Sequence, residues 1–235
     1  MIDVHTHVLP KIDDGSKSIE ETLQMIDEAY TAGFTDIITT SHYIDGHYDI
    51  NSNDRAQIIN GLQNIINSRV TLHNGAEAYI TPELVDLYNE GTIPTLAGSR
   101  YALFELPMNS EVMYAKQVVN DLLNSGYIPI IAHPERYSFV QRNIKKAYEF
   151  ADMGALLQCN YGSFIGRYGR EAEKVAIKLL KEDRITFLGT DTHRSNSTYT
   201  KVSETVEKIR KLTNADKVYK LTVDNPSKIL DNDYI

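Results

Sequence analysis

Histidines and acidic residues lie close together at the start of the chain. The sequence opens Met1-Ile-Asp3-Val-His5-Thr-His7, in which apolar and polar side chains alternate. Alternate side chains of a β-strand point to opposite faces, so Asp3, His5 and His7 are expected on one side. Two imidazoles that converge at a strand end suit a divalent cation such as zinc, manganese or iron. So short a motif is equally compatible with two surface histidines, and the rest of the chain must decide.

Further residues of metal-ligand type follow segments that read as strands. With His5 and His7 they form a set completed by Asp14, His42, Glu77, Glu105, His133, Asp191 and His193. Brought together, their carboxylates would place about four negative charges at close range, which is untenable unless protons or cations compensate them. Two or three divalent ions would neutralise the set. We expect His47, in a loop, and His73, inside a strand, to lie outside it.

Short apolar strands alternate with amphipathic helices along the chain. Strands are expected from Ile2 and at 36–40, 70–74, 101–105, 128–132, 156–159 and 185–189, and helices at 18–33, 52–67, 81–90, 112–124, 143–153, 170–182, 201–212 and 218–230. Ser18 to Glu21 reads as a capping box for the first helix, and Pro129 is unfavourable inside a central strand. The alternation predicts an α/β fold, a distorted (β/α)7 TIM-like barrel. The candidate ligands then belong to the C-terminal rim of the strands, where active sites of such barrels are built.

Length and composition limit the protein class. The 235 residues, with 42% hydrophobic content and no visible linker or repeat, predict one domain spanning 1–235. The strand signal from Ile2 leaves no room for a signal peptide, and no apolar run approaches the ~20 residues that span a bilayer. A single cysteine, Cys159, suits a reducing cytosol, so a cytoplasmic location is expected. The net charge of −8 without a Lys/Arg cluster argues against binding to nucleic acid.

The motifs, taken together, resemble the polymerase and histidinol phosphatase (PHP) superfamily. The similarity rests on Asp3-x-His5-x-His7, Ser41-His42, Glu77, Glu105-Leu-Pro, His133-Pro-Glu-Arg136 and Gly189-Thr-Asp-Thr-His193. It runs in order along essentially the whole chain. Within the superfamily the chain is most similar to the manganese-dependent protein-tyrosine phosphatases that regulate capsule and exopolysaccharide synthesis in Gram-positive bacteria. The loop from Tyr43 to Tyr48 departs from the basic stretch expected there.

The resemblance implies a site with three divalent ions, manganese first, with iron, zinc, cobalt and magnesium as alternatives. His5, His7, Glu77 and Asp191 would hold one ion; Glu77 would bridge to a second, bound also by Glu105 and His133; Asp14, His42 and His193 would hold the third. Asp3 is a candidate for fixing the tautomer of an imidazole. Arg136 and Arg194 stand beside ligands and could clamp phosphate oxygens. The implied substrate is phosphotyrosine on the tail of a membrane-associated bacterial tyrosine kinase.

The chemistry of the leaving group favours aryl phosphates. Two or three ions can generate hydroxide at neutral pH and direct it at phosphorus, which hydrolyses a phosphomonoester without a covalent intermediate. A phenol with a pKa of ~10 departs readily, whereas the aliphatic alcohol of histidinol phosphate calls for a general acid, and none stands out.

Several alternatives stay open. They are a PHP-type histidinol-phosphate phosphatase, a TatD-like or amidohydrolase-like metal hydrolase, and a non-catalytic metal-binding module. A cysteine-based phosphatase needs an arginine six residues after its cysteine, but Ile165 stands there relative to Cys159.

Overall fold

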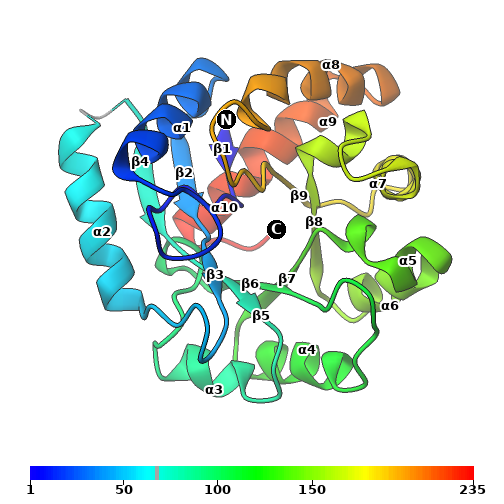
Figure 1. The fold of residues 1–235 in the computed structure, drawn as a ribbon. Helices are drawn as coiled ribbons and strands as arrows, with labels where there is room; N and C mark the ends of the chain where they lie inside the picture. The colour runs from blue at the N-terminus through cyan, green and yellow to red at the C-terminus, as the bar shows by residue number, and fades with distance from the viewer. Residues whose placement is uncertain (67–68) are drawn as a thin grey trace.

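The computed structural model describes residues 1–66 and 69–235, in which short strands pair in parallel inside a ring of helices (Figure 1). One sheet has the order β1-β2-β4 and the other the order β3-β5-β6-β7-β8-β9. Their bounds are β1 Ile2–Asp3, β2 Asp36–Thr39, β3 His42–Tyr43, β4 Thr71–Asn74, β5 Glu77–Tyr79, β6 Tyr101–Glu105, β7 Ile128–Ala132, β8 Leu156–Asn160 and β9 Phe187–Gly189.

Backbone hydrogen bonds join the two sheets into a barrel. Thr40 N–H donates to Thr6 O at 2.9 Å, and Glu77 N–H donates to Thr40 O at 3.0 Å. Across the other seam, Asp191 N–H donates to His5 O at 2.7 Å. Because β2 continues into β3 and β4 into β5 after a two-residue break each, the nine strands follow seven paths. The prediction of a distorted seven-stranded barrel is confirmed, and the distortion lies in these two interrupted paths.

A glycine marks one of the breaks. A Cβ on Gly75 would lie 2.9 Å from Ile38 Cγ2 and 3.2 Å from Thr39 O, so only a residue without a side chain lets the two paths approach this closely. Glu77 begins the strand that follows this break.

The helices cover the outside of the strands (Figure 1). They are α1 Ile19–Thr31, α2 Ser52–Ile65, α3 Leu84–Asn89, α4 Ala115–Asn124, α5 Ser138–Arg142, α6 Lys145–Asp152, α7 Arg170–Lys181, α8 Val202–Leu212, α9 Ala215–Tyr219 and α10 Asn225–Asp231, with short turns η1 Leu96–Gly98, η2 Pro134–Arg136, η3 Tyr161–Ile165, η4 Tyr199–Lys201 and η5 Lys220–Asp224. None of the helices in the described ranges combines the length and apolar character needed to cross a bilayer.

Sequence signals locate most helix ends. Ser18 caps α1 by accepting from Glu21 N–H at 3.2 Å, as a capping box requires. The reciprocal bond is shifted, because the Glu21 carboxylate accepts from Lys17 N–H at 2.8 Å instead of from Ser18. The expected helix 52–67 ends at Ile65, and its last predicted residue lies outside the described part of the chain.

Other predicted boundaries need correction. The helix expected at 143–153 is preceded by α5, which the sequence pattern did not indicate, and the last helix is divided by the π-type turn η5. Pro129 does lie in a strand flanked on both sides, opposite Ala102 of β6. It is the second residue of β7, near the strand start where a missing N–H is best tolerated.

Candidate metal centre

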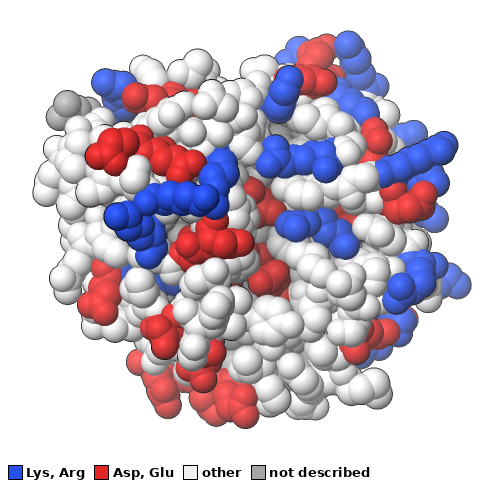
Figure 2. Space-filling view, viewed as in Figure 1, with Lys and Arg blue, Asp and Glu red and all other residues white. Residues whose placement is uncertain are grey.

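The structure brings all nine predicted ligands to the C-terminal rim of the barrel. Seven of them line a cavity of about 220 Å³ with Met108 and Arg136. His5 and His7 are fully buried and contact the carboxylates of that lining. Figure 2 shows acidic side chains in the central hollow of this face, with basic side chains on either side. The gathering follows from the fold, because each ligand lies at the end of a strand, in the loop after it or, for His42 and Glu77, at the first residue after the break in an interrupted strand path.

Glu77 lies at the centre of the cluster and contacts four imidazoles. Its Oε2 atom is 3.1 Å from His5 Nε2, 3.3 Å from His7 Nε2 and 3.1 Å from His42 Nδ1. Its Oε1 atom is 2.8 Å from His133 Nε2. Glu105 reaches the same group, with Oε1 3.4 Å from His42 Nδ1.

Asp191 and Asp14 extend the cluster toward the first and last loops of the rim. Asp191 Oδ1 is 3.4 Å from His7 Nε2, 3.4 Å from His193 Nδ1 and 3.7 Å from His5 Nε2. Asp14 Oδ1 is 3.4 Å from His193 Nε2 and 3.6 Å from His42 Nε2. Three sets of donor atoms are compact enough to hold an ion: His7, Asp14, His42 and His193; His5, His7 and Glu77; and His42, Glu77 and Glu105.

The hydrogen bonds around His5 and His7 leave lone pairs facing one another. His7 Nδ1 pairs with Asp13 Oδ2 at 2.8 Å, and His5 Nδ1 pairs with Gln158 Oε1 at 2.8 Å. Both partners are acceptors, so in the neutral rings both Nδ1 atoms carry the proton and both Nε2 atoms present lone pairs. These Nε2 atoms are 3.2 Å apart and both face Glu77 Oε2. Acceptors directed at acceptors fit a cation between them.

Among the buried atoms that lack a hydrogen-bonding partner in the described residues, Glu77 Oε2 and His42 Nδ1 face each other in this cluster at 3.1 Å. A buried polar atom without a partner costs about 1–3 kcal/mol. Ions coordinated at this point would satisfy these atoms and the facing Nε2 lone pairs together. The residues therefore fit the divalent metal ions that the sequence predicts.

The electrostatics of the cluster show the same need for positive charge. Burial, and next the charge of Glu77, raise the pKa of Glu105 to about 9. Burial lowers the pKa of His42 to about 4. Burial alone would raise the pKa of Glu77, but His5, His42 and His133 hold it well below its ordinary value. Without a cation, Glu105 is thus protonated at neutral pH, and a bound divalent ion would take the place of that proton.

Two of the nine residues have a left-handed backbone. His133 has φ 34° and Asp191 has φ 49°, in the region that favours glycine. Such conformations cost about 1–3 kcal/mol each and concentrate at functional sites, where the surroundings hold them. His133 follows β7 directly, Asp191 lies two residues after the end of β9, and both side chains line the cavity.

The two arginines predicted to bind phosphate have different surroundings. Arg136 lines the cavity, its Nη1 lies 2.5 Å from Asp191 Oδ2, and its guanidinium stacks 4.4 Å from the centre of the Tyr168 ring. Arg194 does not line this cavity. Its Nη1 donates to Gly15 O and, at 2.7 Å, to His193 O. In this structure Arg194 joins the loop of Asp14 to the loop of His193, and its expected role in binding phosphate stays a prediction.

Asp3 is fully buried, but it does not fix an imidazole as expected. Its oxygens accept from Thr190 Oγ1 at 2.6 Å, Thr190 N at 3.0 Å and Tyr199 OH at 2.8 Å, and from the backbone of His5 at 3.3 Å. Burial raises its pKa in spite of these donors. Asp3 thus ties the first strand to the last one, beneath the cluster.

The residues that do orient imidazoles are Asp13 and Gln158, and sequence reasoning missed both. Asp13 also accepts from His42 N–H at 2.8 Å, so it joins two ligand loops. Its position beside Asp14 was the available signal. For Gln158 the signal was a polar residue, two before Asn160, within the otherwise apolar strand β8.

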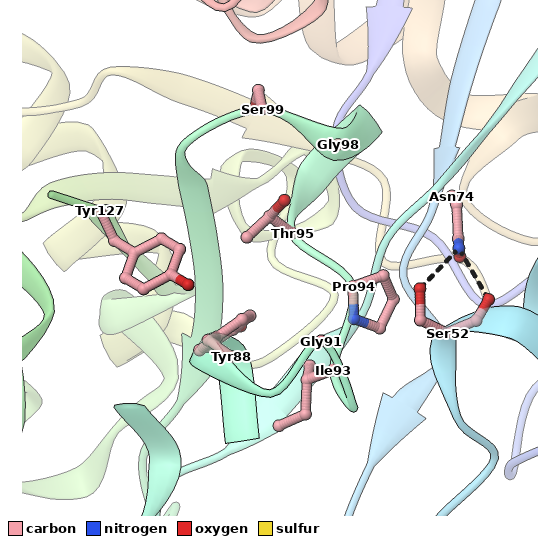
Figure 3. A pocket seen from close by; sticks show the side chains of 10 residues that line it. All are labelled: Ser52, Asn74, Tyr88, Gly91, Ile93, Pro94, Thr95, Gly98, Ser99 and Tyr127. Carbon is pink, nitrogen blue, oxygen red and sulfur yellow. Dashed lines mark hydrogen bonds between the residues drawn. The ribbon is translucent and has the colours of Figure 1, made fainter. Parts of the chain in front are cut away.

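The two excluded histidines lie elsewhere. His47 is exposed in the loop after β3, and His73 pairs with Asp36 at 2.9 Å. A separate cavity of about 280 Å³ lies among α2, α3 and η1, as Figure 3 shows, and no Asp, Glu, His, Lys or Arg is among its lining residues. In its lining, the side-chain amide of Asn74 donates to Ser52 O at 3.0 Å.

Comparisons with known proteins agree with this geometry. Residues 1–231 match the family described as capsular polysaccharide synthesis, CpsB/CapC. The chain is 32% identical to tyrosine-protein phosphatase CpsB of Streptococcus pneumoniae over 238 residues, which cover 98% of each chain. It is 30% identical to tyrosine-protein phosphatase YwqE of Bacillus subtilis, covering 100% of this chain and 93% of the relative.

A solved structure resembles the whole barrel. It belongs to a study of YwqE from Bacillus subtilis and CpsB from Streptococcus pneumoniae, described as unique metal-dependent tyrosine phosphatases. It superposes with a TM-score of 0.95 at 28% identity and covers 100% of this chain and 96% of the other. The chain therefore belongs to the CpsB/CapC family of capsular polysaccharide synthesis proteins.

Proposed function

We propose that this protein is a metal-dependent protein-tyrosine phosphatase that acts in the regulation of capsule or exopolysaccharide synthesis. The observation that carries the proposal is the environment of Glu77 Oε2, which has three imidazole nitrogens within 3.3 Å and no hydrogen-bond donor among the described residues. The relatives CpsB and YwqE, both named tyrosine-protein phosphatases, support the reaction class.

Three divalent ions, with manganese as the first candidate, account for the nine residues. We assign His5, His7, Glu77 and Asp191 to one ion, Glu77, Glu105 and His133 to a second, and Asp14, His42 and His193 to a third. When bound, such ions polarise phosphoryl oxygens and lower the pKa of water. The compact donor sets support the grouping of His5 and His7 with Glu77 and of Asp14 with His42 and His193. His7 also belongs to the second of these sets, and His42 lies close enough to Glu77 and Glu105 to serve the second ion.

Arg136 is the residue we assign to the phosphoryl group. A guanidinium has five donors in a planar fork, and one of them is used by Asp191. The remaining donors suit the non-bridging oxygens of a phosphate in the same cavity. Stacking on Tyr168 restricts the guanidinium in advance, which lowers the entropy cost of ordering it when substrate binds.

Cys159 does not support the rival cysteine mechanism. Its side chain is fully buried, and burial raises the pKa of its thiol well above the ordinary value. A phosphatase nucleophile must be an accessible thiolate. A free cysteine of this kind suits a reducing compartment, so we propose that the enzyme is cytoplasmic. We also propose that residues 1–235 form a single domain.

The substrate we propose is a phosphotyrosine-bearing protein, specifically the tail of a bacterial tyrosine kinase. A phenolate leaves without strong acid assistance. The test is a parallel assay of a phosphotyrosine peptide, a phosphoserine peptide and histidinol phosphate, with metal content measured on the same preparation. Selective turnover of the phosphotyrosine peptide is expected. Selective turnover of histidinol phosphate would replace the substrate assignment, and no turnover by metal-loaded protein would favour a binding module.

A further inference from the structure

Strand β8 supplies two buried side-chain amides that connect His5 to Asp191, two of the ligands assigned to the first ion. Gln158 and Asn160 are two residues apart, so their side chains share one face of the strand, and both are fully buried. Gln158 Oε1 lies 2.8 Å from His5 Nδ1, Gln158 Nε2 donates to Asn160 Oδ1 at 2.9 Å, and Asn160 Nδ2 donates to Asp191 Oδ2 at 2.6 Å. Neither amide belongs to the proposed ligand set.

The hydrogen bonds that link Asp191, Asn160, Gln158 and His5 allow only one order of donors and acceptors. The carboxylate of Asp191 only accepts, so Asn160 must present its NH2 group to it and its oxygen to Gln158. Gln158 must then present its NH2 group to Asn160 and its oxygen to His5. That oxygen also receives His133 N–H at 3.4 Å, which favours the same orientation. The proton of a neutral His5 is therefore held on Nδ1, and Nε2 keeps the lone pair that an ion requires.

The same series of hydrogen bonds determines which oxygen of Asp191 faces the cluster. Oδ2 receives Asn160, Arg136 at 2.5 Å and Tyr168 at 3.4 Å, whereas Oδ1 faces His5 and His7. Asn160 is itself held from below, because its N–H donates to Glu135 Oε1 at 2.9 Å. The carboxylate is thus fixed through one oxygen while the other remains free to bind an ion.

The side chain of Gln158 packs closely against Gly189. A Cβ added to Gly189 would lie 2.5 Å from His5 Cβ and 2.7 Å from Gln158 Nε2. The amide therefore fills the space between β9 and the ring of His5, and glycine at 189 is what makes that space available.

We propose that Gln158 and Asn160 form an amide relay that connects Asp191 to His5 and holds the proton of the neutral His5 ring on Nδ1, so that both ligands are oriented before an ion arrives. They are positioning residues, and the proposal rests on the metal centre proposed above. Hydrogen-bond partners of metal ligands typically contribute 10–100-fold to metal affinity. The relay couples two ligands that come from opposite ends of the sequence.

The test uses Gln158→Met, which keeps the length of the side chain without an amide, and Asn160→Leu, which keeps its branching. Leu157→Met, on the same strand but the opposite face, is the matched control for repacking of a buried position. Manganese affinity is measured by chelator competition, and thermal unfolding of the metal-free proteins reports on folding. The His5 tautomer of metal-free protein is measured by nitrogen-15 NMR at alkaline pH, where the ring is neutral.

We expect wild-type His5 to carry its proton on Nδ1. Gln158→Met should lower manganese affinity at least tenfold, and Asn160→Leu should shift the His5 tautomer although Asn160 does not touch that ring. Leu157→Met should change neither. The relay is refuted if His5 in folded wild type carries its proton on Nε2, or if both variants fold and keep wild-type tautomer and affinity. If wild type binds no manganese, the proposed function fails, but the tautomer measurement still decides the relay.

Discussion

Removing the guanidinium of Arg136 should impair catalysis while the ions stay bound. Asp191 Oδ2 receives three donors, and in Arg136→Ala it keeps Asn160 at 2.6 Å and Tyr168 at 3.4 Å. Its Oδ1 atom continues to face His5 and His7. Because the arrangement of ligands survives, we expect metal content to be unchanged.

The loss of activity can be estimated from a single contact to phosphate. A hydrogen bond to a charged group contributes about 1.5–3 kcal/mol. Each 1.36 kcal/mol changes a rate tenfold, so kcat should fall about 10- to 150-fold if the contact is made in the transition state. The control is Arg184→Ala, which removes an exposed arginine paired with Asp152 at 2.6 Å and should leave kcat unchanged.

The assay combines kcat and KM for a phosphotyrosine peptide with metal analysis of the same samples. A fall in kcat with full metal content supports the phosphate role. The reasoning is refuted if Arg136→Ala loses its ions, since Arg136 would then be a support for Asp191, or if kcat stays at the wild-type value.

Three further predictions follow from the same geometry. Cys159→Ala should keep activity within about twofold, and iodoacetamide should not inactivate the folded wild type, because the buried thiol has a raised pKa; loss of activity in a folded variant would reopen the cysteine mechanism. Removing ions with EDTA should abolish activity and lower the melting temperature, by about 5–10 °C for each ion that was present at 100 times its Kd; an unchanged melting temperature in calorimetry would contradict ion binding at these residues. Gly15→Ala should destabilise the protein by more than about 2 kcal/mol in urea unfolding, because its Cβ would lie 2.3 Å from His7 O, whereas Gly61→Ala in helix α2, with nothing within 4 Å, should stabilise it by about 0.5–1 kcal/mol; equal effects of the two substitutions would show that the loop of Gly15 adapts.

The ligand set could be predicted because barrel folds place chemistry at known points of a sequence pattern. A strand is short and apolar when both of its faces are covered, and the residue after it must reach the rim. His133 after β7 and Glu105 at the end of β6 follow this rule. This prediction depends only on where the strands end, so the errors in helix limits described above do not affect it.

The supporting residues could not be predicted in the same way. Asp13 and Gln158 orient imidazoles, whereas Asp3, which was predicted on the same strand face as the histidines, does not. Which acceptor meets a given Nδ1 depends on contacts between residues up to 153 positions apart in sequence. Local patterns hold no information on such contacts.

The sequence by itself determined the alternation of strands and helices, the family resemblance and the nine side chains that gather at the rim, since periodicity and strand ends are local properties. The tertiary structure alone decided how those side chains are oriented. It placed Arg136 in the lining of the cavity, Arg194 against the carbonyls of Gly15 and His193, and the amide of Gln158 against His5. The physical reason is that hydrogen bonds are directional and short, so their partners are selected only when the whole barrel has closed.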